Sequence, residues 1–119
     1  MKEKSNKLVV RAKTFEAWMK NNFTIENFKD MVEHGIDTGW NCLTWYDDTI
    51  VLFEKFKVEI FDRVDGDADD LGYTYGEMMK FLCDKYNAYD YKTFANAMVW
   101  YMAVQIAYDV LRKKFPGEY

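Results

Sequence analysis

Histidine and cysteine are scarce in this sequence, and each scarcity disfavours a class of catalytic, metal or disulfide site. The only histidine is His34, so a Ser-His-Asp or Cys-His catalytic arrangement would have to use it. His34 ends a predicted helix ahead of Gly35, where an imidazole is suited to the negative helix C-terminus. The two cysteines, Cys42 and Cys83, lie far apart and match no metal-ligand spacing, so two buried, reduced thiols are expected. We predict no catalytic residues, no metal and no cofactor.

Long apolar runs and phosphate-binding glycine patterns are also absent. The N-terminal apolar run, Leu8-Val9-Val10, is too short for a signal-peptide core. No stretch approaches the roughly 18 apolar residues of a membrane span. Gly35 and Gly39 are not followed by a phosphate-loop pattern. The sequence therefore predicts a soluble, cytoplasmic protein that has no membrane contact.

Charge is distributed unevenly along the chain. Residues 1–13 carry five basic residues against Glu3, a local balance of +4, which leaves −8 for the remainder of a chain of net charge −4. The single proline is Pro116, and no linker or repeat divides the sequence. We predict a basic N-terminal arm at 1–13 and one helical domain at 14–119. The acidic domain disfavours direct, sequence-specific nucleic-acid binding.

Hydrophobic periodicity predicts an all-α fold, a compact bundle of about five helices. The C-terminal helix is apolar nearly all round, so it should be the central one. Residues 35–44 are predicted to form a loop, and 7–13 a short strand or an extended arm. The third helix ends near Val64 or continues to Leu71 with a break at Gly66. The predicted helices are 15–22, 25–34, 45–64, 75–86 and 91–114, with Thr24, Thr74 and Asp90 as N-caps.

Five aspartates in a short segment form the first candidate site. They are Asp62, Asp65, Asp67, Asp69 and Asp70. A calcium loop that starts at Asp65 would need glycine at its sixth place and glutamate at its twelfth, where Asp70 and Gly76 stand. Calcium binding is therefore disfavoured, and two interpretations without a metal are a solvated acidic face, or carboxylates that imitate nucleic-acid phosphates in a basic groove of a partner.

Aromatic residues form the second candidate site. Four Trp, nine Tyr and nine Phe are many for a core of this size, and Tyr and Trp are enriched in protein interfaces. Some of them should be exposed and form a surface for a partner or for self-association. The two clusters are Trp40, Trp45 and Tyr46, and then Tyr73, Tyr75, Tyr86, Tyr89 and Tyr91.

Three groups of residues together resemble a known family. They are Phe28–Gly35, Leu43–Ile50 continuing into Glu54–Ile60, and Val99–Ala103 with Ala107. The likeness is to small acidic proteins encoded by tailed phages and prophages. It covers most of residues 23–111, excludes the basic arm and transfers no catalytic residues.

The resemblance implies an accessory phage protein, and small phage proteins without active sites often block host machinery. We therefore expect a stoichiometric inhibitor of a host defence nuclease complex, an anti-CRISPR or anti-restriction protein. The partner would be a host protein or ribonucleoprotein in the host cytoplasm, met by the five aspartates and anchored by Trp40, Trp45 or Tyr46. One alternative is a structural or assembly module that acts as a helical homodimer. Another is a metal-dependent enzyme built on the aspartates.

Overall fold

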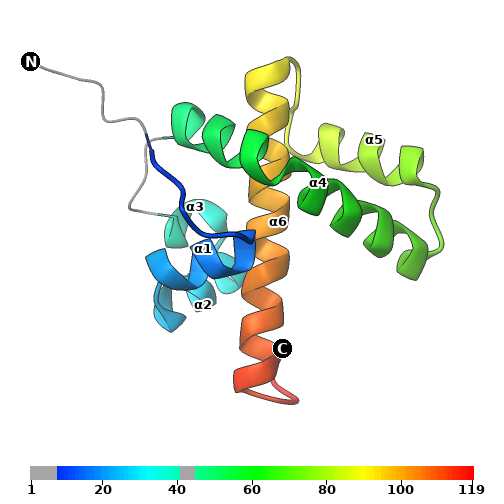
Figure 1. The fold of residues 1–119 in the computed structure, drawn as a ribbon. Helices are drawn as coiled ribbons and strands as arrows, with labels where there is room; N and C mark the ends of the chain where they lie inside the picture. The colour runs from blue at the N-terminus through cyan, green and yellow to red at the C-terminus, as the bar shows by residue number, and fades with distance from the viewer. Residues whose placement is uncertain (1–7, 41–44) are drawn as a thin grey trace, which may run out of the picture.

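The computed structural model describes residues 8–40 and 45–119 of the chain, and the described residues form six α-helices (Figure 1). The described part contains no strand, so the all-α prediction is confirmed and the expected strand at the N-terminus is absent from residues 8–13. The helices are α1 (Phe15–Asn22), α2 (Ile25–Glu33), α3 (Ile36–Gly39), α4 (Trp45–Leu71), α5 (Tyr75–Lys85) and α6 (Tyr91–Lys114).

Side-chain caps explain where several helices begin. Thr24, Thr74 and Asp90 each accept a hydrogen bond from the backbone amide three residues on, as the sequence predicts. Glu77 completes the box at α5, because its carboxylate accepts from the Thr74 amide at 2.8 Å. Each cap satisfies amides that have no partner inside the helix, and such a cap is worth about 1 kcal/mol.

Helix α6 lies at the centre of the fold, with the other helices packed around it (Figure 1). It contacts each of the other five described helices. Its side chains are buried on nearly every side, and Ala97, Met98 and Val99 are consecutive residues that are each 0% exposed. The prediction of a hydrophobic central helix at the C-terminus is therefore confirmed.

Helix α4 crosses α6 and is bent at its middle. Its apolar stripe, Leu52, Phe53, Phe56, Ile60 and Val64, is buried as predicted. The only non-helical dihedrals inside it are at Phe56 (φ −112°, ψ 16°), where the ring stacks on Phe15 at a centroid distance of 5.3 Å. The predicted break at Gly66 is wrong, since the helix continues through an open, exposed position.

Contacts between helices fix α1 and α3. The Phe15 amide, at the start of α1, donates to both carboxylate oxygens of Glu59 in α4 at 3.1 Å. The loop predicted for residues 35–44 contains the short helix α3, which packs on α2. Gly35 turns the chain with φ +110°, and Gly39 lies so close to Asn27 and Met31 that no Cβ could be placed there without movement.

Candidate protein-binding site

The five aspartates of the first candidate site do not share one environment. At about 100° per helical residue, Asp62, Asp65 and Asp69 fall on one face of α4, and Asp70 lies beside that face. All four are exposed. Asp67 points to another side of the helix and is half-buried. The structure therefore separates four solvent-facing carboxylates from a fifth that faces the body of the protein.

Asp67 belongs to a polar network that joins α4 to α6. Arg63 Nε donates to Asp67 Oδ1 at 2.9 Å, and Arg63 Nη1 donates to Asp109 Oδ2 at 2.8 Å. The phenol of Tyr101, in α6, donates to the second oxygen of Asp67. Asp67 is thus engaged by groups of this chain and helps to join α4 to α6.

The same network shifts the acid–base behaviour of its members. The hydrogen bond to Asp109 raises the pKa of Arg63, with burial acting in the opposite direction and Asp67 reinforcing the rise. Burial and the hydrogen bond to Asp67 raise the pKa of Tyr101. Both groups therefore keep their protons near neutral pH, and the network stays intact as a fixed set of donors and acceptors.

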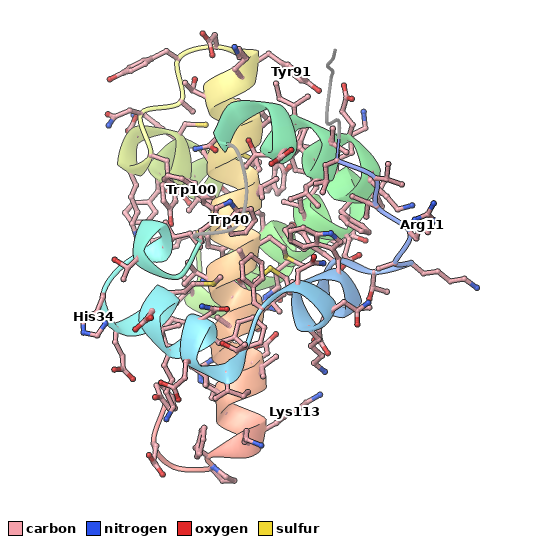
Figure 2. All side chains as sticks on the ribbon, turned by 90° about the vertical axis from the view of Figure 1, so that its left-hand side faces the viewer. Arg11, His34, Trp40, Tyr91, Trp100 and Lys113 are labelled. Carbon is pink, nitrogen blue, oxygen red and sulfur yellow. The ribbon has the colours of Figure 1, made fainter. Side chains whose placement is uncertain are left out.

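The predicted aromatic anchors are placed differently from expectation. Trp40 is only 2% exposed, with its ring 5.2 Å from that of Phe23 and 5.9 Å from that of Trp18. The indole lies in the core beside α6 (Figure 2), so Trp40 presents no exposed ring in this structure. Trp45 and Tyr46 begin α4, but their side chains lie outside the described part of the structure.

Exposed apolar side chains gather where α4 ends and α5 begins. Leu71 is 62% exposed, Tyr73 is 55% exposed and Phe81 is 58% exposed. We use the name α4–α5 surface for these three side chains and the exposed carboxylates Asp62, Asp65, Asp69 and Asp70 of α4. Asp70 lies near Leu71 and Phe81, whereas Asp62, Asp65 and Asp69 are on the other side of α4. The expectation that some tyrosines are exposed is confirmed, since Tyr75, Tyr89 and Tyr91 also reach solvent.

A groove of about 690 Å³ lies next to this surface. Helices α2 and α3 form one wall, α5 forms the other, α6 forms the floor, and the end of α4 closes one side. A smaller hollow of about 360 Å³ adjoins it, and Leu71, Met78 and Phe81 line both. The lining of the groove is Met31, Val32, Gly35, Ile36, Asp67, Asp70, Leu71, Met78, Phe81, Leu82, Lys85, Tyr86, Tyr101, Val104, Gln105 and Tyr108.

The residues considered for catalysis or metal binding, His34 and Cys83, do not line the groove or the smaller hollow. His34 caps α2 and points away from the body of the protein (Figure 2), with Nδ1 at 3.4 Å from Asp30. Cys83 is free and half-buried rather than buried, and burial raises the pKa of its thiol. Within the described residues, no three His, Cys, Asp or Glu side chains are grouped as a metal ion would require. No described helix is long and apolar enough to cross a membrane.

The groove was not predicted from the sequence, although one feature of the sequence indicates it. Helix α5 carries Met78, Met79, Phe81 and Leu82 within one and a half turns, more apolar positions than a single buried stripe uses. One of them had to face solvent, and the structure shows that it is Phe81. The opposite wall, from α2 and α3, comes from a region more than 35 residues before α5 in sequence, and periodicity cannot pair such distant segments.

No curated protein and no solved structure matches the chain. Residues 5–116 match a family described as a domain of unknown function, DUF7222. The match includes all six described helices together with the groove and the α4–α5 surface. The chain therefore belongs to the DUF7222 family.

Proposed function

We propose that this protein acts as a stoichiometric binding protein, without catalysis, and that it contacts a partner protein through the α4–α5 surface. The observation that carries the proposal is that residues 62–81 hold both four exposed carboxylates and the exposed side chains of Leu71, Tyr73 and Phe81, with Asp70, Leu71 and Phe81 lining one groove. Exposed apolar groups that occur together with charges of one sign are typical of a protein interface. The apolar groups contribute affinity, and the charges attract an oppositely charged partner during association.

The charges indicate the kind of partner. Asp62, Asp65 and Asp69 share one helical face, and none of them forms an ion pair among those found in the described residues. A partner with lysine or arginine side chains around an apolar contact would complement this surface. A partner surface that carries lysine and arginine in this way is characteristic of proteins that bind nucleic acids.

The narrower proposal concerns the biological target. The resemblance to small proteins of tailed phages and prophages favours a host defence nuclease complex, whose nucleic-acid channel is basic. In this proposal the protein is an anti-CRISPR or anti-restriction inhibitor that occupies such a channel in the host cytoplasm. The α4 carboxylates take the places of phosphates, and the chain itself does not read a nucleic-acid sequence.

The experiment is charge reversal on α4. The double variant Asp65→Lys and Asp69→Lys changes two exposed carboxylates and leaves the Arg63–Asp67 pair in place. Wild-type and variant proteins are used to capture partners from host lysate, followed by mass spectrometry, and captured nuclease complexes are then assayed for inhibition. We expect the variant to lose capture and inhibition by about tenfold or more, as two cross-interface charge contacts are reversed.

The matched control reverses two exposed carboxylates on other parts of the molecule, Glu26→Lys and Glu118→Lys. This control has the same net charge as the test variant, so it separates the local surface from overall charge. Circular dichroism confirms that both proteins are folded. Equal capture by the two variants would contradict the role of the α4 carboxylates, and the absence of any specific partner would contradict the proposed function.

The exposed apolar residues also support the alternative function, a structural homodimer. A second copy of the chain could cover Leu71, Tyr73 and Phe81 and so remove them from water. Light scattering over a range of concentrations distinguishes the two. A monomer throughout favours the partner-binding function, whereas a tight dimer that the double variant Leu71→Ser and Phe81→Ser dissociates favours the structural module.

A further inference from the structure

The groove and the smaller hollow form one elongated depression. The two share Leu71, Met78 and Phe81, so an apolar ridge separates a volume of about 690 Å³ from one of about 360 Å³. A compact ligand would occupy one of the two hollows. Only an extended ligand with apolar groups at regular spacing would occupy both.

The floor and the walls of the groove differ in rigidity. On the floor, Tyr101 is held by its hydrogen bond to Asp67, and Asp67 is held by Arg63. Tyr108 lies under the guanidinium of Arg112, 4.9 Å from its ring centroid. The walls include Met31 and Met78, whose flexible side chains adapt to the shape of a ligand. The ordered floor lowers the ordering cost of binding, and the methionines of the walls can fit apolar groups of different shapes.

The border of the depression carries more acidic than basic groups. Asp70 lines the groove and Glu77 lines the smaller hollow, and both are exposed. Among the described lining residues the only ammonium is that of Lys85, which lies 5.5 Å from the ring centroid of Tyr86. A ligand that fits these charges is basic at its edges and apolar at its centre.

We infer that the depression receives the apolar face of a basic, amphipathic α-helix from the partner protein. In such a helix, apolar side chains at positions i, i+3 or i+4, and i+7 enter successive hollows while lysines or arginines meet the acidic border. The inference rests on the proposed function, because it names the part of the partner that is bound. It adds a recognition element that the α4 carboxylates alone do not define.

The test uses a synthetic peptide with the full-length protein. The peptide has about 18 residues of leucine and lysine, about 27 Å when helical, with all leucines on one face and a fluorophore at one end. Fluorescence anisotropy measures its dissociation constant. A peptide of the same composition with leucines on all faces is the reference, and we expect it to bind at least about tenfold more weakly.

Matched variants locate the binding site. The double variant Leu71→Ser and Phe81→Ser removes two exposed apolar side chains that line both hollows. The control Val9→Ser and Val58→Ser removes two side chains that are 66% and 71% exposed and line neither hollow. We expect the first to weaken amphipathic-peptide binding about tenfold and the second to change it less than about twofold.

Chemical-shift mapping provides a measurement that does not depend on a variant. Titration of the amphipathic peptide into the isotopically labelled protein should shift the amide signals of Val32, Ile36 and Val104, from a wall and the floor of the groove. Shifts confined to residues 62–70, or equal binding of both peptides, would overturn the helix-in-groove inference. The proposed function would still stand if charge reversal on α4 abolished capture of the partner, so the two failures are distinguishable.

Discussion

Arg63 is a single residue that binds carboxylates on two helices. It donates to Asp67 within α4 and to Asp109 on α6, and its side chain is 26% exposed. The pair Lys80–Asp84 has the same sequence spacing and a similar distance of 2.9 Å, yet its side chains are 78% and 69% exposed. Water screens the Lys80–Asp84 pair strongly and the Arg63 pairs much less. Only the Arg63 pairs should therefore contribute measurably to stability.

We predict that Arg63→Met lowers the free energy of unfolding by about 1–2 kcal/mol, because Asp67 and Asp109 lose their shared cation while the aliphatic packing is kept. Lys80→Met, the matched control, should leave the free energy of unfolding unchanged within experimental error, because water screens this exposed pair. Urea denaturation followed by circular dichroism measures both. Similar losses in the two variants would show that the network between α4 and α6 has no special energetic role.

At the scale of helices, two glycines have opposite surroundings. Gly39 ends α3 against α2, and a Cβ added there would meet the Asn27 carbonyl oxygen and the Met31 side chain. Gly66 lies inside α4, and a Cβ added there would meet nothing within 4 Å. The first glycine permits two helices to approach closely, whereas the second only weakens its own helix.

The substitution Gly39→Ala should therefore destabilise the protein by about 1–3 kcal/mol through steric conflict between α3 and α2. Gly66→Ala should stabilise it by about 0.5–1 kcal/mol, since alanine has the higher helix propensity and finds open space. Thermal unfolding of the two variants beside the wild type gives the comparison. A stabilised Gly39→Ala protein would mean that α3 does not pack on α2 in solution as described.

The molecule as a whole is organised by α6. This helix contacts each of the other described helices, and it carries the floor of the groove together with Tyr101 and Asp109 of the polar network. Since no group of described helices packs independently of α6, the protein should unfold in one cooperative transition. Binding at the groove would then be coupled to the stability of the entire fold.

Leu111→Ala provides the test of cooperativity. Leu111 is 0% exposed in the last turns of α6, and its truncation should cost about 2–4 kcal/mol. Far-UV circular dichroism and tryptophan fluorescence, which includes signals from Trp18 and Trp40 near α1 and α3, should shift together. Two separate midpoints in the variant would show that α1–α3 unfold independently of α4–α6.

The sequence by itself determined the helices whose signals are local. Thr24, Thr74 and Asp90 cap helices as predicted because each cap joins a side chain to an amide three residues away. The buried stripe of α4 and the central place of α6 also follow from sequence, since periodicity records which faces avoid water. Four of the five candidate aspartates are exposed, which agrees with the prediction that this segment is the charged side of a surface helix.

Only the tertiary structure decided which polar and aromatic residues are exposed and which are buried. Trp40 entered the core because α3 packs on α2. Asp67 became internal because Tyr101 and Asp109, which lie on α6 more than 30 residues further along the chain, complete its network. The bend at Phe56 and the groove between α2–α3 and α5 likewise depend on contacts between distant segments. Periodicity reports burial along one element, whereas pairing across elements depends on side-chain packing that no local pattern encodes.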